Sequence, residues 1–250
     1  IFKLGGVQAI GAMAFGTASV PAVGKIFGPG NRYVMAAKQQ VQTRGVAIDM
    51  PAGPSEVMIV ADAGADPRFL AADFLSQAEH GPDSQSILVT ACRELADRLP
   101  AEIERQATCL PRRELVEQSL SHSSIVCLDD EAEQLALVNA YAPEHLIVHR
   151  ADAEAWAEGV VNAGSVFLGY YTPESAGDYA SGTNHTLPTS GYARAYSGVN
   201  LDSFTRKITF QHISPEGLKN LGPVIETMAA AEQLDAHRRA VAVRLQNLDL

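Results

Sequence analysis

Short apolar runs alternate with longer amphipathic stretches along the chain from about residue 57 onward. The apolar runs are rich in β-branched and aliphatic side chains, and they predict buried strands at EVMIVAD (56–62), SILVT (86–90), SIVCL (124–128), HLIVHR (145–150) and SVFLG (165–169). The stretches between them predict helices near residues 67–80, 93–106, 131–140 and 152–162. This order predicts an α/β fold in which helices cover both faces of a mostly parallel sheet.

The first 54 residues show the same pattern on a smaller scale. IFKL (1–4) reads as a strand before a Gly-Gly turn, VQAIGAMAFGT (7–17) as a helix, KIFGPGN (25–31) as a strand and turn, and RYVMAAKQQV (32–41) as a second helix. DMPAGPSE (49–56) is a plausible crossing to the main domain. We therefore expect a partial α/β unit over 1–54 and a main α/β domain over 55–200. Because the chain opens inside such a pattern, we also expect sequence upstream of Ile1.

The C-terminal part reads differently. Residues 171–206 have no clear element of their own, and a loop of this length is usually functional or disordered. Its aromatic and apolar side chains argue against disorder. The last 36 residues predict helices, one with Pro223 just inside its start and a second that Asp235 caps. Residues 201–250 are thus expected to form a helical tail.

Charge and composition exclude several classes of protein. The net charge is −10 and no block of Lys or Arg is present, which argues against a nucleic-acid partner. No apolar run is long enough for a membrane span, and no signal-peptide pattern opens the chain. The cysteines have wide spacings that match no zinc-finger or redox pattern, and we expect buried or half-buried thiols in a reducing compartment, the cytoplasm: Cys92, Cys109 and Cys127.

The stretch SQAEHGPDSQ (76–85) places Gln77 and His80 where a helix should end. Residues three apart are neighbours on one helix face, and an amide oxygen with an imidazole nitrogen can make half of a metal site. A capping histidine beside a surface glutamine is the alternative interpretation.

In YAPEHLIV (141–148), Glu144 and His145 stand immediately before an apolar strand. A histidine next to a carboxylate can supply general-base chemistry near neutral pH. The alternative is an ordinary surface pair.

Two further pairs lie nearer the C-terminus. Asp178 and His185 occur among glycines and serines in the irregular section, where they suit metal or substrate binding. Glu232 and His237 are five apart, so a break at Asp235 would be needed for both to point into one cavity. The remaining histidines are not part of such motifs and are expected to be structural or exposed: His122, His149 and His212.

A glycine-rich phosphate loop of the G-x-G-x-x-G type is absent. Gly28, Gly30 and Asn31 precede a predicted helix and are compatible with an anion-accepting helix N-terminus, although this pattern is not specific.

Taken together, the motifs of this chain resemble those of histidinol dehydrogenase in kind and in order: GGVQAIGAMAFGT, KIFGPGN, AIDMPAGPSEV, LSQAEHGPDSQ, YAPEHL, PESAGDYASGTNHTLPT and LDAH. The resemblance covers essentially the whole chain and corresponds to the C-terminal part of a longer enzyme. It implies a zinc- and NAD-dependent dehydrogenase that oxidises L-histidinol through the aldehyde to L-histidine. It also implies that the mostly parallel sheet with its flanking helices is Rossmann-like but incomplete, and that residues 1–54 form a partial nucleotide-binding α/β unit.

The resemblance also implies roles for particular residues. The implied zinc ligands are Gln77, His80, Asp178 and His237. Glu144 and His145 match the catalytic pair. Further positions match substrate contacts, namely Ser55, His185 and Glu232, and nucleotide contacts, namely Gln8 and Asn31. The family's active site lies between the subunits of a homodimer, which implies that Glu232 and His237 reach the site of the partner subunit.

The chemistry of the implied ligands is consistent with this activity. Zinc held by two imidazoles, one carboxylate and one amide can still accept donors from an amino alcohol, and because zinc is not redox active, hydride must leave to an organic carrier. His145 would remove the alcohol proton and Glu144 would help water add to the aldehyde. Two alternatives remain open at this stage: a zinc hydrolase without nicotinamide, and a non-catalytic protein in which zinc stabilises a dimer.

Overall fold

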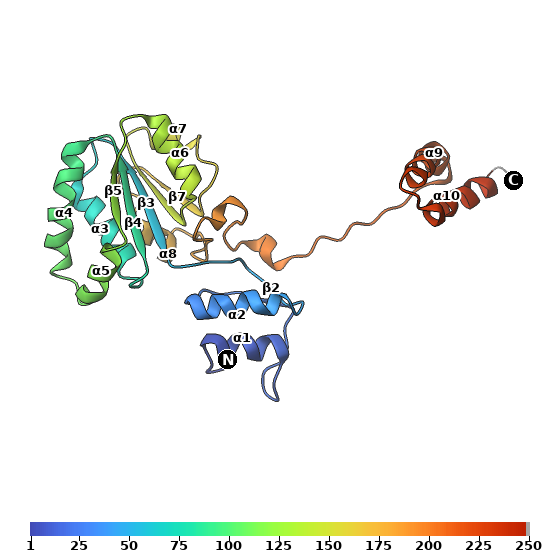
Figure 1. The fold of residues 1–250 in the computed structure, drawn as a ribbon, viewed down its shortest axis with the longest axis horizontal. Coiled ribbons are helices and arrows are strands. Elements are labelled where there is room, and N and C mark those ends of the chain that lie inside the picture. Colours follow the sequence, from blue (N-terminus) through green and yellow to red (C-terminus); the bar gives the residue numbers. More distant parts are fainter. Residues whose placement is uncertain (249–250) are drawn as a thin grey trace. The chain divides into compact units, whose positions relative to one another are not determined.

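The computed structural model describes residues 1–248, and the chain forms two compact units. The first unit runs from Ile1 to Phe204, and the second begins at Thr205. The first unit contains both sheets of the chain (Figure 1), and the second is built from helices.

The main sheet has five parallel strands in the order β5-β4-β3-β6-β7. Their bounds are Glu56–Ala61 (β3), Gln85–Thr90 (β4), Ser124–Cys127 (β5), His145–His149 (β6) and Ser165–Leu168 (β7). Strand β3 is central and pairs with β4 on one side and β6 on the other, so the strand order reverses beside β3. This doubly wound topology confirms the predicted α/β fold with a parallel sheet.

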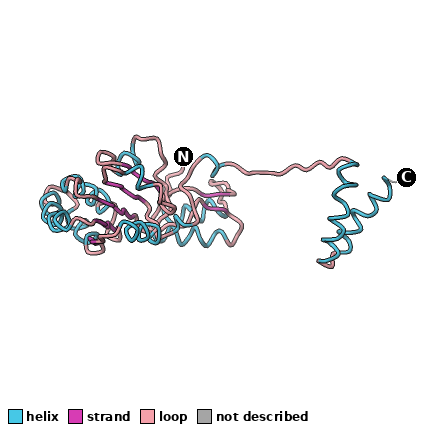
Figure 2. The backbone as a smooth tube through the Cα atoms, turned by 90° about the horizontal axis from the view of Figure 1, so that it is seen from above, coloured by secondary structure: helices cyan, strands magenta, loops and turns pink. Residues whose placement is uncertain are grey.

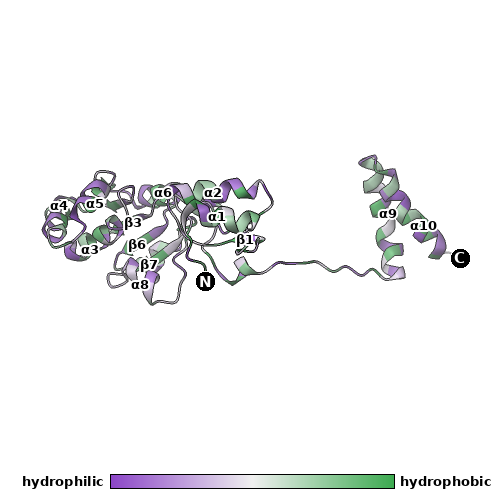
Figure 3. Cartoon of the chain, turned by 90° about the horizontal axis from the view of Figure 1, so that it is seen from below, coloured by the Kyte–Doolittle hydropathy of each residue, from purple (hydrophilic) through white to green (hydrophobic). Residues whose placement is uncertain are grey.

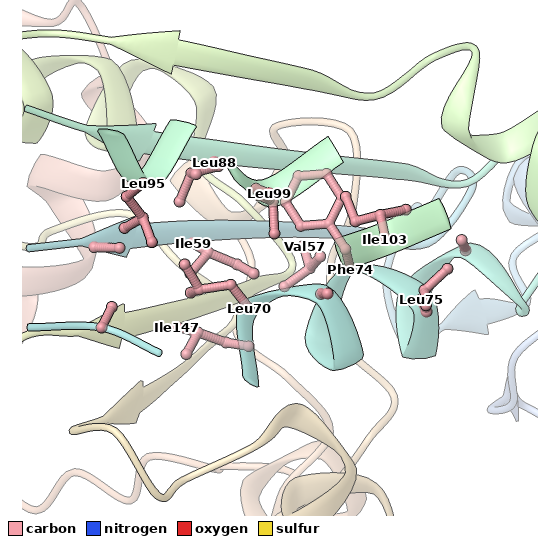
Figure 4. Packing of buried hydrophobic residues seen from close by; sticks show 14 of the residues in the cluster. Val57, Ile59, Leu70, Phe74, Leu75, Leu88, Leu95, Leu99, Ile103 and Ile147 are labelled. Atoms are coloured by element: carbon pink, nitrogen blue, oxygen red, sulfur yellow. The ribbon is translucent and has the colours of Figure 1, made fainter. Parts of the chain in front are cut away.

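Helices cover both faces of this sheet because β3 is apolar on both sides. Val57 and Ile59 pack against side chains of α3 (Pro67–Ala78) and α4 (Arg93–Ala107), as Figure 4 shows, and the same cluster includes a residue of α5 (Arg113–Leu120). Met58 and Val60 face α6 (Glu131–Tyr141) and α7 (Ala153–Ala157). Alternate residues of one strand thus enter two separate cores, which is typical of a buried parallel strand.

The N-terminal segment forms a small α/β layer with its own core. It contains α1 (Gly6–Phe15), β1 (Lys25–Ile26), α2 (Arg32–Gln42) and β2 (Ala47–Ile48), and the two strands pair in parallel. A buried ion pair joins Lys38 to Asp49. Lys38 also donates to the Gly28 carbonyl, while Asp49 accepts the Gly28 N–H, so this pair fixes the loop before α2. Gly28 has a φ of 136°, which favours glycine.

Several local predictions were wrong. Residues 1–5 form no strand, although a strand was expected at 1–4. The structure contains a helix that was not predicted, α5, and α7 ends earlier than expected, before the Gly159 turn. The irregular section holds α8 (Glu174–Tyr179) and two short 3₁₀ turns, Tyr192–Arg194 and Leu201–Phe204. Short helices of this kind leave almost no periodic signal, because they depend on tertiary contacts.

The second unit is a helical hairpin of α9 (Pro215–Ala231) and α10 (Asp235–Leu248), which confirms the predicted helical tail (Figure 2). The predicted start at Pro223 was wrong, since that residue lies inside α9. Ser214 caps the helix by accepting the Gly217 N–H, and Pro215 follows at the first helical position, where its missing N–H costs nothing. A Cβ on Gly222 would meet Leu245 at 2.8 Å, so the two helices pack closely.

The cysteines are unpaired, as expected. Cys92 and Cys127 are half-buried, whereas Cys109 is exposed, because it lies in the turn after α4 rather than on a packed face. Among the residues described, we find no helix with the length and apolar character that crossing a membrane would require.

Gly164 permits a close approach that shapes the start of β6. A Cβ at this position would lie 2.6 Å from the Glu144 carbonyl oxygen. We therefore expect Gly164→Ala to lower the free energy of unfolding by about 1–3 kcal/mol, because backbone must move to relieve the overlap. Denaturant titration measures this change. Gly24→Ala is the matched control, since a Cβ there meets nothing within 4 Å. Equal stabilities of the two variants would contradict the prediction.

Candidate metal and catalytic site

The polar residues singled out in the first unit gather at the amino edge of the main sheet. Ser55 precedes β3, Glu144 precedes β6, and the end of α3 leads into β4. All these strands are parallel, so their starts share one edge. Open α/β sheets usually bind ligands at the opposite, carboxyl edge.

The end of α3 presents Gln77 and His80 to this edge. Asp66 caps the start of α3 and Pro67 follows it, so the helix begins at a well-defined residue. The last regular residue is Ala78, but the His80 N–H donates to the Gln77 carbonyl and continues the turn. Gln77 is fully buried and both polar atoms of its amide lack a hydrogen-bond partner. A buried amide without partners is costly, which points to a missing ligand.

Helix α8 supplies two carboxylates to the same place. Glu174 and Asp178 are four residues apart and therefore share one face of the helix. Ligand atoms of His80, Glu174 and Asp178 all lie within 4.8 Å of one another. Glu174 was not among the residues singled out in the sequence, although its spacing of four from Asp178 is a signal that could have revealed it.

Glu144 and His145 enter this cluster from the start of β6. Both side chains are buried. The Glu56 N–H donates to Glu144 Oε2 at 3.0 Å, which ties the carboxylate to the start of β3. His145 Nδ1 lies 3.8 Å from Glu144 Oε2, and His145 Nε2 lies 4.0 Å from Asp178 Oδ1. The predicted acid–base pair is therefore part of a larger group of carboxylates and imidazoles.

Burial shifts the ionisation of these groups. It raises the pKa of Glu144 to about 8, although the hydrogen bond from the Glu56 backbone opposes the shift. It lowers the pKa of His145 to about 4, against the attraction of Asp178. Burial, followed by the charge of Asp178, raises the pKa of Glu174 well above its usual value. Crowded buried carboxylates of this kind are stabilised as anions when a cation binds between them.

The cluster opens into a cavity of about 250 Å³. Six of the residues that line it carry the chemistry: Ser55, His80, Glu144, His145, Asp178 and His185. Its opposite wall includes the loop that Lys38 and Asp49 hold. A second cavity of about 350 Å³ shares Ser55 and His80 with the first and extends to Asn31 and Tyr33.

The structure thus brings together most, but not all, of the residues singled out in the sequence. Gln8 is exposed on α1 and does not line either of these two cavities. Glu232 and His237 lie in the second unit, where Glu232 ends α9 and His237 is in the first turn of α10. The helix is interrupted between these two residues, as a shared cavity would require, because α9 ends at Ala231 and α10 begins at Asp235. Gln233 in this turn has a φ of 59°.

Asn31 caps α2, and its side-chain oxygen accepts the N–H groups of Tyr33 and Val34. These two amides are therefore not available to an anion, contrary to the expectation for this helix N-terminus. The remaining histidines are structural or exposed, as predicted. His149 is buried 3.1 Å from Asp73, and His122 and His212 are exposed.

The donor set suits zinc. His80 offers an imidazole nitrogen, and Glu174 and Asp178 offer carboxylate oxygens in the same cluster. Gln77, three residues before His80, adds a buried amide without hydrogen-bond partners among the described residues. Zinc accepts nitrogen and oxygen ligands of these types. The residues present therefore fit the metal that the sequence resemblance implied.

Comparison with known proteins identifies the family to which the chain belongs. The family model described as histidinol dehydrogenase matches residues 1–245. Histidinol dehydrogenase of Bacteroides thetaiotaomicron is 65% identical over 99% of this chain and 58% of its own length, and the chloroplastic enzyme of Arabidopsis thaliana is 56% identical over 100% and 54%.

The solved structure of histidinol dehydrogenase from Elizabethkingia anophelis superimposes with a TM-score of 0.96 at 56% identity, covering 100% of this chain and 58% of that one. The chain therefore spans a little over half the length of these relatives. A match over nearly every residue, at such identity and with the same fold, means that this chain belongs to the histidinol dehydrogenase family.

Proposed function

We propose that the protein containing this chain oxidises L-histidinol through L-histidinaldehyde to L-histidine, with zinc and NAD. One observation carries the proposal: donors suited to zinc and the buried Glu144–His145 pair line one cavity of the first unit. A hydrolase would need the metal and an activated water alone, whereas family membership favours the dehydrogenase.

On this proposal Gln77, His80 and Asp178 hold zinc from one chain, and His237 of a second copy completes the set. Zinc held there would supply a Lewis acid that orients an amino alcohol, and NAD would supply the hydride acceptor. Ser55, His185 and the second copy's Glu232 contact the substrate, while Gln8 and Asn31 contact the nucleotide. The cavity's mixture of imidazoles and carboxylates suits a small, polar, cationic substrate.

His145 is the proposed base. Burial lowers its pKa to about 4, so near neutral pH its ring is uncharged and can accept a proton. It takes the proton of the substrate hydroxyl as hydride leaves the adjacent carbon. The proton must leave the ring before the second oxidation, in which His145 serves as base again.

Glu144 is the proposed activator of water. Because burial raises its pKa to about 8, this carboxyl group can exchange a proton near neutral pH. Its Oε2 is held by the Glu56 N–H, which fixes the direction of the carboxylate. It takes a proton from the water that adds to the aldehyde carbon, and the hydrate then loses hydride.

The second unit supports a homodimer. Its helix α9 exposes apolar side chains that a monomer would leave in water: Leu221, Val224 and Met228. Figure 3 shows apolar and polar residues along both helices of the hairpin. Exposed apolar surface of this kind marks an interaction site, and a second copy of the chain is the partner that would exchange Glu232 and His237.

His145→Asn should slow turnover at least about a hundredfold while zinc content is retained, because it removes the base and no proposed ligand. Histidinol-dependent NADH formation and elemental analysis measure the two quantities. His122→Asn is the control, since that histidine is exposed and far from the cavity lining. Parallel losses of zinc and turnover would refute the separation of roles.

His237→Asn should lower zinc content, whereas His212→Asn, in the same unit, should not. Mixing His237→Asn with His145→Asn subunits tests whether the tail acts in the partner. A hybrid dimer then has one site with both residues intact, so random mixing should restore about a quarter of wild-type activity. No recovery after verified subunit exchange would mean that the tail serves its own chain.

Glu144→Gln should change how stability depends on pH in the zinc-free protein. The pKa of Glu144 is raised from 4.5 to about 8, so the native state holds this proton more tightly than the unfolded chain. Wild-type stability is therefore fully present at low pH and is lost as pH rises through this window. Glu144→Gln lacks this loss. The difference between its free energy of unfolding and that of the wild type should therefore grow in favour of the variant up to about pH 8 and then stay constant. The free energy of unfolding is measured by denaturant titration at each pH, with Glu79→Gln as the control variant. If the plots of this free energy against pH ran parallel for wild type and Glu144→Gln, they would contradict the assignment.

A further inference from the structure

Glu174 is a buried carboxylate to which neither the sequence motifs nor the proposed mechanism gives a role. Its side chain is 1% exposed, and its Oε2 has no hydrogen-bond partner. Its Oε1 lies 3.7 Å from His145 Nδ1 and 3.8 Å from His80 Nε2. His145 Nδ1 is also buried and makes no hydrogen bond of ordinary length to the described residues, although a backbone interaction with Glu56 acts to raise the pKa of the ring. A buried carboxylate, whose second oxygen has no partner in the described part of the chain, thus lies beside a buried ring nitrogen.

The two carboxylates of α8 lie at opposite nitrogens of the His145 ring. Glu174 lies near Nδ1, and Asp178, one turn further along the helix, lies 4.0 Å from Nε2. A neutral imidazole carries its proton on only one nitrogen, and the other nitrogen is then the base. The carboxylate that accepts the ring N–H therefore decides which nitrogen can take a proton from substrate.

We propose that Glu174 is a positioning residue that accepts the N–H of His145 Nδ1 and so leaves Nε2 free as the base. Nε2 is on the side of Asp178, which lines the substrate cavity with His145. A separation of 3.7 Å is longer than a hydrogen bond, and bonds of this kind tighten when substrate binds. The role of Nε2 as base depends on the proposed function, whereas the position of the ring proton does not.

Glu144 is the other carboxylate near Nδ1, at 3.8 Å. Its nearer oxygen, Oε2, already accepts the Glu56 N–H. Glu144 is also the group proposed to activate water. For that task its carboxylate must be able to accept a proton from water, and accepting the His145 ring N–H would weaken it as a base. Glu174 has no such engagement among the hydrogen bonds of the described residues, so it is the better acceptor for the ring proton.

The test compares Glu174→Met, which keeps the volume but removes the acceptor, with Glu174→Gln, which keeps one acceptor oxygen. The full-length protein is labelled with ¹⁵N-histidine, and the His145 ring signals are assigned by their loss in His145→Asn. We expect wild type and Glu174→Gln to hold the proton on Nδ1, and Glu174→Met to show a mixture of tautomers. The kcat should fall about tenfold for Gln and about a hundredfold for Met, with KM nearly unchanged.

Zinc content separates positioning from ligation. Glu174→Met should retain zinc, unlike Asp178→Asn, and exposed Glu79→Met should change neither zinc nor kcat. Loss of zinc to the extent seen in Asp178→Asn would make Glu174 a ligand and overturn the proposal. So would a wild-type proton on Nε2, or an unchanged kcat in Glu174→Met. If the Met variant does not fold, a Gln variant with wild-type kcat overturns the proposal equally.

Failure of the wild type to oxidise histidinol would refute the proposed function. The NMR signals would still show which ring nitrogen of His145 carries the proton.

Discussion

The crowding of buried polar groups at the amino edge of the main sheet is the constraint on which the site depends. Glu144, His145 and Glu174 are almost fully enclosed, and the Gln77 amide has no partner. Groups in this condition raise the free energy of the folded chain unless a cation and polar ligands satisfy them. The apolar side chains buried on both faces of the sheet stabilise the folded chain and offset this unfavourable free energy. A cation bound among these groups would therefore stabilise the folded state of this unit.

The two edges of the sheet have different roles. At the carboxyl edge, where doubly wound folds usually bind ligands, charged groups are paired with each other. Arg150 lies 2.5 Å from Glu131 and 2.8 Å from Asp152, and the Tyr170 hydroxyl donates to Asp62. At the amino edge, by contrast, several buried polar atoms of the described residues have no hydrogen-bond partner, namely those of the Gln77 amide, His145 Nδ1 and Glu174 Oε2. The unpaired polar atoms, rather than the general rule for the fold, are the reason for proposing the site at the amino edge.

Sequence patterns predicted the regular parts of the structure well, because buried parallel strands leave long apolar runs. They missed α5 and α8, which are short and held by contacts with distant residues. They singled out Gln77, His80, Glu144 and Asp178 as separate local motifs, but only the strand order shows that these lie at one edge. Glu174 was missed because a glutamate in an irregular section looks like a solvent-exposed residue; its spacing of four from Asp178 was the one sequence signal, and its burial in the structure makes that signal meaningful. The assigned role of each residue rests on family resemblance and remains a proposal.

The hairpin of the second unit has a consequence for how such an enzyme can change. Because Gly222 of α9 has no Cβ, Leu245 and Val241 of α10 can approach α9 closely. The turn between the two helices is only a few residues long. Glu232 and His237 are therefore held at a fixed spacing on one stiff element. If one of them recognises substrate and the other holds metal, selection cannot adjust specificity by moving this hairpin without also altering metal retention. New substrate preferences would then have to arise from the walls of the first unit.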